Sequence, residues 1–94
     1  EESLAEQSTR KGNRLVEAFN ANRPTIVRDV RHLGLMVGIE LKERVQPYII
    51  ALMEAGILAL PAGPTVLRLL PPLVISDDDI DTVVAELHTA LGNA

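Results

Sequence analysis

The feature that most constrains this chain is a short apolar run, Val66 to Leu73 (VLRLLPPL), which holds one arginine and closes with two prolines. Proline has no N–H to donate to a sheet, so a strand in this run has to end before Pro71. Alternation along that strand places Arg68 on one face and both neighbouring leucines on the other. A guanidinium on a mostly covered face needs a carboxylate, a phosphate or water, because an unpaired buried charge is costly. The run therefore predicts a cation near a strand end, with Glu40 as one possible partner inside the fold.

Apolar periodicity along the chain predicts three helices and four strands in a single domain, residues 1–94. The helices are expected over 3–21, 46–55 and 76–91, and the strands over 26–31, 35–41, 57–60 and 66–69. The order α-β-β-α-β-β-α fits a two-layer α+β domain with its helices on one face of the sheet. In the first strand, simple alternation places Ile26, Arg28 and Val30 on the same side.

Local signals fix several ends of these elements. Ser76, followed by three aspartates, forms a variant of the capping box, so the last helix is expected to begin there. Gly12 lies in the middle of the first helix, where it costs about 1 kcal/mol relative to alanine, and it indicates close packing against a neighbouring element. Gly34 and Gly38 lack the Gly-Lys-Ser/Thr of a phosphate loop and are attributed to turn formation and close packing.

The composition excludes several function classes. A net charge of -4 with scattered arginines argues against nucleic-acid binding. The chain has no cysteine, so it has neither disulfides nor thiolate sites. No apolar run reaches the roughly 20 residues of a membrane span, and the N-terminus is unlike a signal peptide. A soluble, cytoplasmic protein is expected.

No metal site is predicted. The acidic cluster 77–81 lacks the alternating oxygen ligands and central glycine of a calcium loop, and helix capping explains it. The two histidines, His32 and His88, have no metal-ligand spacing, and each is expected at the surface.

Three motifs in this order resemble the C-terminal domain of class III pyridoxal-phosphate aminotransferases. They are RHLGLMVGIEL at 31–41, GIL at 56–58 with AGPT at 62–65, and VLRLLPPL at 66–73, followed by an acidic helix start. The resemblance spans about residues 27–91 and is greatest to the acetylornithine aminotransferase branch, including relatives that act on carrier-bound lysine. His32 departs from the glycine usual at that place, and no role is transferred to it.

The resemblance implies a small domain of a fold-type I transferase and a role for one arginine. Arg68 matches the arginine that receives the α-carboxylate of 2-oxoglutarate or glutamate, and Gly63 and Thr65 match a loop near the substrate mouth. A planar fork of donors suits bidentate capture of a carboxylate.

The resemblance also implies that the chemistry lies elsewhere. The lysine, the aspartate and the phosphate loops that hold pyridoxal phosphate in such enzymes belong to a large domain expected before Glu1. Neither Lys11 nor Lys42 falls in a motif of that kind. The chain is thus expected to be a fragment that contributes no catalytic, cofactor-binding or metal-binding residue and binds no cofactor alone.

The leading hypothesis is an aminotransferase, dimeric or larger, that acts on an acylated or carrier-bound diamino acid of acetylornithine or lysine type. Glutamate and 2-oxoglutarate would be its amino donor pair, and arginine or lysine biosynthesis its setting. The alternative is a free-standing module that captures a small carboxylate through Arg68 without catalysis, or an interaction domain with an apolar face. The sequence does not distinguish the diamino acids.

Overall fold

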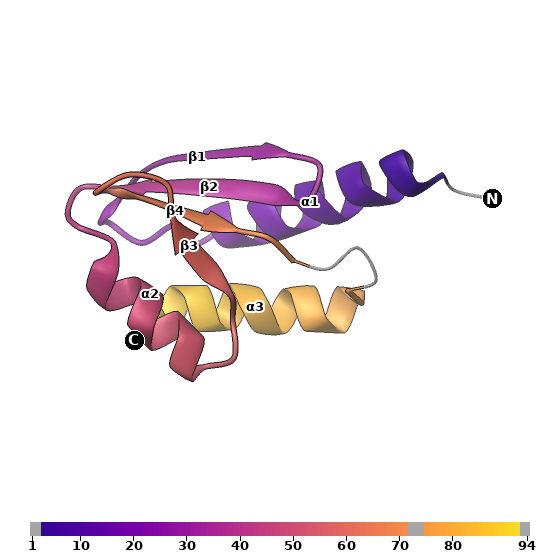
Figure 1. Ribbon diagram of the computed structural model, residues 1–94. Helices are drawn as coiled ribbons and strands as arrows, with labels where there is room; N and C mark the ends of the chain where they lie inside the picture. The colour runs from indigo at the N-terminus through magenta and orange to yellow at the C-terminus, as the bar shows by residue number, and fades with distance from the viewer. Residues whose placement is uncertain (1–2, 72–74, 93–94) are drawn as a thin grey trace.

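Four antiparallel strands form one sheet, and all three helices pack on the same face of it (Figure 1). The computed structural model describes residues 3–71 and 75–92. The elements are α1 (Leu4–Asn20), β1 (Val27–Leu33), β2 (Met36–Leu41), α2 (Gln46–Glu54), β3 (Ala59–Pro61), β4 (Val66–Leu69) and α3 (Asp77–Ala90). Their spatial order in the sheet is β1-β2-β4-β3. The predicted element order and the two-layer α+β architecture are confirmed.

The hydrophobic core lies between the sheet and the helices. Strands β2 and β4 contribute Val37, Ile39, Leu41, Leu67 and Leu69, and the helices contribute Leu15, Phe19, Leu52, Ile80 and Leu87, all at most 1% exposed. Both leucines that flank Arg68 therefore face the helices, as alternation along the strand predicts. The opposite face of the sheet is open in this chain and carries both charged side chains, such as Arg31 and Arg68, and exposed apolar ones, such as Leu33.

Glycine makes the closest contact between α1 and the sheet. A Cβ placed on Gly12 would lie 1.8 Å from the carbonyl oxygen of Gly34, in the turn between β1 and β2. Gly34 itself has φ 58°, a left-handed backbone conformation that residues with a side chain rarely adopt. The prediction of close packing at Gly12 is confirmed, and the contact fixes how α1 crosses the β1–β2 hairpin.

Helix α3 begins where the sequence predicts. Ser76 is extended at φ -81° and ψ 164°, and its hydroxyl oxygen accepts a hydrogen bond of 3.1 Å from the backbone N–H of Asp79. Three aspartates occupy the first turn, near the positive end of the helix dipole. The capping interpretation is confirmed.

Strand β1 departs from simple alternation. Its pairing with β2 shifts between Val27 and Asp29, which is a β-bulge. The extra residue restarts the alternation, so Val27 is buried and Val30 packs on the core, while Arg28 is exposed. The prediction that Arg28 shares a face with Val30 is wrong for this reason. Strand β3 also begins later than predicted and includes Pro61, which an edge strand tolerates.

Both histidines are half-buried, so the prediction of surface positions is wrong. The ring of His88 stacks on Phe19, with centroids 5.3 Å apart, and its Nε2 lies 3.0 Å from the Phe19 carbonyl oxygen. The Nδ1 atom of His32 lies 3.3 Å from the carbonyl oxygen of Gly34. The ring of His88 thus joins α3 to α1, whereas the contact of His32 lies within the β1–β2 hairpin. No helix in the described part of the chain is long and apolar enough to cross a membrane.

Candidate functional site

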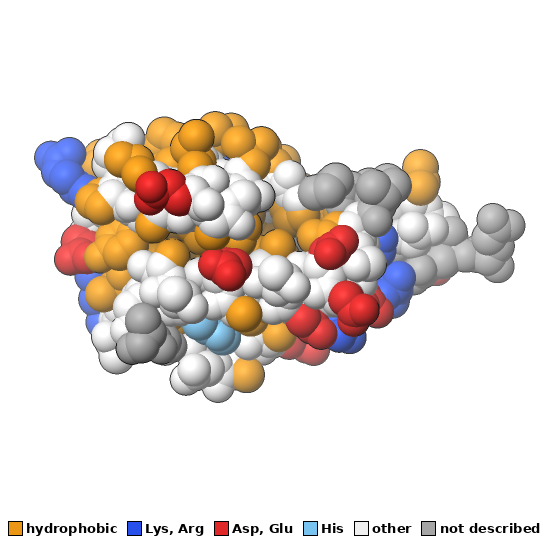
Figure 2. Space-filling model, turned by 90° about the horizontal axis from the view of Figure 1, so that it is seen from below, with side chains coloured by type: hydrophobic (Ala, Val, Ile, Leu, Met, Phe, Trp, Pro, Cys, Tyr) orange, Lys and Arg blue, Asp and Glu red, His pale blue; other side chains and the backbone are white. Residues whose placement is uncertain are grey.

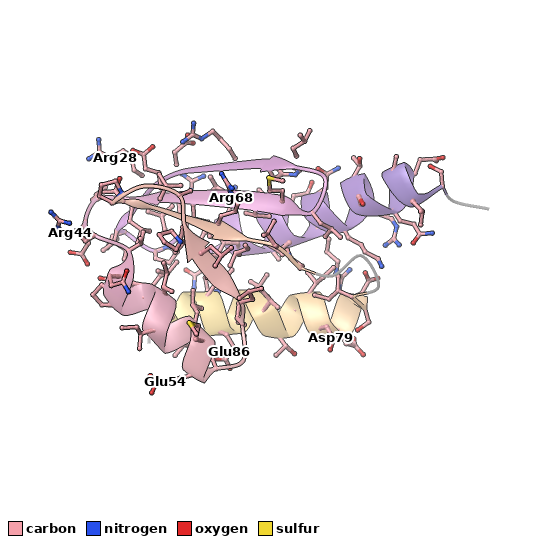
Figure 3. All side chains as sticks on the ribbon, viewed as in Figure 1. Arg28, Arg44, Glu54, Arg68, Asp79 and Glu86 are labelled. Atoms are coloured by element: carbon pink, nitrogen blue, oxygen red, sulfur yellow. The ribbon has the colours of Figure 1, made fainter. Side chains whose placement is uncertain are left out.

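Arg68 projects from the open face of the sheet. It lies on β4 between Gly38 of β2 and Leu60 of β3, which are its direct cross-strand partners. Figure 3 shows its side chain on the side of the sheet away from α2 and α3. The two strand pairings therefore fix the backbone of Arg68, and its side chain points away from the helices.

Glu40, one possible partner of Arg68 in the sequence analysis, does not pair with it. The Glu40 carboxylate pairs with Arg31 instead, with Nη2 and Oε1 3.4 Å apart, and the Arg31 Nε atom lies 3.3 Å from a carboxylate oxygen of Asp29. Within residues 3–71 and 75–92, Arg68 has no hydrogen bond or ion pair, and it is exposed. The register brings Glu40 opposite Val66, two residues along β4 from Arg68. As far as the described residues go, all donors of the Arg68 side chain are available to a ligand.

A shallow hollow of about 400 Å³ lies beside Arg68 on this face. Its lining residues come from β1, β2, β4 and the loop before β4: Arg31, His32, Leu33, Met36, Gly38, Ala62, Val66 and Arg68. Leu33 and Met36 are 82% and 46% exposed, so the hollow has an apolar rim next to its cationic wall. This combination suits a small molecule that carries a carboxylate on a short aliphatic chain.

The predicted loop residues Gly63 and Thr65 lie in the turn between β3 and β4 and do not line the hollow. Gly63 has φ 125°, and the Thr65 carbonyl oxygen accepts a hydrogen bond of 2.7 Å from the N–H of Leu41. This hydrogen bond therefore connects the turn before β4 to the end of β2. Ala62 and Val66, which flank these positions, do line the hollow, and a substrate role for Gly63 and Thr65 stays a prediction.

Neither lysine fits the attachment of pyridoxal phosphate at this site. Lys11 is 9% exposed in α1, on the helix side of the sheet, and Lys42 follows β2 at an exposed position. Neither lines the hollow beside Arg68. The expectation that this chain binds no cofactor alone stays a prediction.

A second, larger hollow of about 1040 Å³ follows the exposed side of α1. Arg14 donates a hydrogen bond of 2.9 Å to Asp81 of α3, and Arg10 lies 3.5 Å from Asp77. The hydrogen bond to Asp81 raises the pKa of the Arg14 guanidinium above its usual value. Figure 2 shows several acidic side chains gathered toward one end of the molecule, with Lys or Arg side chains beside them. Because the cations already have partners, this surface joins two helices and is a weaker ligand candidate.

Among the described residues, no group of three acids or histidines could hold a metal ion.

Sequence reasoning found Arg68 but missed Arg31, Met36 and Gly38 as its neighbours. The only available signal was the strand pairing, because Gly38 stands opposite both arginines in the sheet register. Together, the fold and the hollow define a small α+β domain that presents an unengaged guanidinium on an open sheet face.

The chain belongs to the class III aminotransferase family, whose model, "Aminotransferase class-III", matches residues 1–91. It is 47% identical over 93 residues to a [LysW]-aminoadipate semialdehyde transaminase of Deinococcus radiodurans, covering 98% of this chain and 22% of that protein. It is 39% identical to an acetylornithine aminotransferase of Bacillus subtilis, covering 94% of this chain and 23% of the relative.

Solved structures agree with this assignment. A lysine aminotransferase of M. tuberculosis superposes with a TM-score of 0.83 at 31% identity, over 94% of this chain and 21% of that one. An ornithine aminotransferase of Plasmodium yoelii gives 0.85 at 28% identity, over 94% of this chain and 25% of that one. The chain therefore spans less than a quarter of the length of the curated relatives described above. The predicted family is confirmed.

Proposed function

We propose that this chain is the C-terminal small domain of a pyridoxal-phosphate-dependent aminotransferase, and that Arg68 binds the α-carboxylate of glutamate or 2-oxoglutarate. Family membership supports the reaction class, since class III aminotransferases depend on pyridoxal phosphate. The short span relative to the curated relatives supports a longer parent protein. The parent would use residues outside this chain to hold the cofactor.

The observation that carries the proposal is the unengaged guanidinium of Arg68 above the hollow. Arg14 and Arg31 have carboxylate partners. Arg28 and Arg44, like Arg68, have none among the described residues, but of these three exposed arginines only Arg68 lines the hollow. Strand pairing on both sides fixes the backbone of Arg68. Hydrogen bonds to charged groups contribute about 1.5–3 kcal/mol each, so a bidentate carboxylate contact can determine the orientation of a small substrate.

In this proposal the cofactor performs the chemistry and this domain binds the substrate. The cofactor supplies the electron sink that amino-group transfer requires. Arg68 supplies binding energy and orientation, and the apolar rim at Leu33 and Met36 restricts water on one side of the carboxylate. This domain thus positions a substrate whose reaction takes place on groups of the parent.

The proposed amino donor or acceptor, besides glutamate and 2-oxoglutarate, is an acylated or carrier-bound diamino acid. The relatives named above act, by their names, on [LysW]-aminoadipate semialdehyde and acetylornithine, and other relatives are ornithine aminotransferases. All of these compounds carry a reacting group at the far end of an amino-acid chain. Arginine or lysine biosynthesis, a homodimer or larger assembly and a cytoplasmic location complete the proposal.

Arg68→Lys in the longer protein tests the role of Arg68. Lysine keeps the charge and loses the fork, so kcat/KM for 2-oxoglutarate should fall by on the order of tenfold or more, while the cofactor absorption spectrum and the melting temperature stay normal. Arg28→Lys is the matched control, because Arg28 is also an exposed arginine of this sheet and lies outside the hollow (Figure 3).

Two results would contradict the assignment. An unaltered kcat/KM for 2-oxoglutarate in Arg68→Lys removes the carboxylate contact from the proposal. A lowered melting temperature with normal kinetics in the surviving folded enzyme would instead mean that Arg68 supports the fold.

A further inference from the structure

Gly38 occupies an unusual place between two arginines. In the sheet register it stands directly opposite Arg31 on β1 and directly opposite Arg68 on β4. Directly opposed residues in antiparallel strands point to the same face, so the three positions form a row across the open face of the sheet. Neighbouring strands lie about 4.8 Å apart, which places the two arginine backbones about 10 Å from each other with no side chain between them.

Gly38 is the one described glycine with no backbone reason to be glycine. Gly12 could not carry a Cβ because of the Gly34 carbonyl oxygen, and the remaining glycines other than Gly38 have positive φ: Gly34, Gly56, Gly63 and Gly92. At Gly38, by contrast, φ is not positive, and the nearest atom to an added Cβ is the Arg31 carbonyl oxygen at an ordinary 3.9 Å. Glycine in a strand interior is unfavourable, and it often marks a place where a ligand or another backbone comes close. The attribution of Gly38 to turn formation or close packing in this chain is therefore wrong.

The two arginines beside Gly38 differ in what they already bind. Arg31 is held by Asp29 and Glu40, so its charge is largely balanced. Arg68 has no partner among the described residues. A ligand that binds between them would have Arg31, already in ion pairs, on one side. On the other side it would meet the unpaired donors of Arg68.

We infer that Gly38 is a specificity-determining residue. Because it has no side chain, its backbone forms the floor of a slot through which a carboxylate reaches Arg68. This inference rests on the proposed function, and it adds that the slot admits the carboxylate of a small 2-oxo acid or amino acid. A side chain at this position would project into the hollow that Gly38 and Arg68 both line. It would separate the carboxylate from the guanidinium without disturbing the strand.

The test uses the longer protein with Gly38→Ala and Gly38→Val. Valine should raise the KM for 2-oxoglutarate by on the order of tenfold or more, with alanine giving a smaller increase and kcat changing far less than KM. Calorimetric titration with 2-oxoglutarate should show the same order of affinities. The melting temperatures of both variants should equal or exceed that of the wild type, because either residue suits a strand interior better than glycine. Leu60→Val is the matched control: it lies on the other side of Arg68 and outside the hollow, so the affinity should not change.

The outcomes separate this inference from the proposed function. An affinity for 2-oxoglutarate that is unchanged in Gly38→Val overturns the inference alone, provided that Arg68→Lys still weakens binding. A Gly38→Val variant that melts at a lower temperature but binds 2-oxoglutarate as the wild type does also overturns the inference. The space beside Gly38 would then be filled by another part of the parent protein. A wild-type protein that binds 2-oxoglutarate through Gly38 and Arg68 without transaminating it overturns only the proposed reaction. A wild-type protein that does not bind 2-oxoglutarate overturns both.

Discussion

Replacing Gly12 by alanine should destabilise this chain, although alanine is the better helix former. An added Cβ would lie 1.8 Å from the carbonyl oxygen of Gly34, 2.8 Å from its carbonyl carbon and 3.2 Å from Nδ1 of His32. Ordinary contact begins near 3.4 Å, so α1 and the β1–β2 turn would have to separate by about 1.6 Å. The two nearest of these atoms belong to the Gly34 backbone, so rotating a side chain cannot relieve the contact.

The magnitude follows from two opposing effects. Helix propensity favours alanine over glycine by about 1 kcal/mol. Overpacking of a rigid contact costs about 1–3 kcal/mol and occasionally more, and two backbones in direct conflict belong at the upper end of that range. The expected net loss is about 2 kcal/mol, which corresponds to a melting temperature lower by about 8–16 °C for a domain of this size.

Urea and thermal unfolding followed by circular dichroism would measure the loss, provided that both transitions fit a two-state model. Asn13→Ala is the matched control. It also introduces alanine, a better helix former, at an exposed position of the same helix, and it should change the free energy of unfolding by less than about 0.5 kcal/mol. A melting temperature of Gly12→Ala equal to or above that of the wild type would refute the argument, because helix propensity would then outweigh the contact with Gly34.

Two further predictions concern the cap and the cofactor. Ser76→Ala removes the hydroxyl that accepts from Asp79 and should cost about 0.5–2 kcal/mol in thermal melts, whereas Ser76→Asn keeps a capping oxygen and should stay near the wild type; an unchanged midpoint in the alanine variant would show that the cap contributes nothing. This chain should form no site-specific aldehyde adduct with pyridoxal phosphate, because neither Lys11 nor Lys42 lies in the hollow; borohydride reduction and mass spectrometry test this, and a stoichiometric adduct on either lysine would contradict it.

Strand alternation sufficed to place Arg68 on the face opposite Leu67 and Leu69, because the two-residue period of a strand is a property of the local backbone. It failed in β1, where the bulge between Val27 and Asp29 depends on how β1 pairs with β2. The half-burial of His88 could not be predicted either, because its ring contacts Phe19, which is 69 residues away in the sequence. The sequence therefore predicted Arg68, with Gly63 and Thr65 as site neighbours, and did not predict the surface that Arg68 forms with residues of β1 and β2.

The sequence by itself determined what depends on near neighbours in the chain. The Ser76 cap, the glycine at the end of the β1–β2 turn, the apolar faces of the helices and the strand that carries Arg68 all follow from local sterics and hydrogen bonding. Only the tertiary structure decided that β2 lies between β1 and β4. That order pairs segments about 30 residues apart, and it is selected by burial of a shared core. It also places Gly38 between Arg31 and Arg68, and it pairs Glu40 with Arg31, so that Arg68 has no carboxylate partner in the described part of the chain. These contacts depend on register and strand order, which no local pattern encodes.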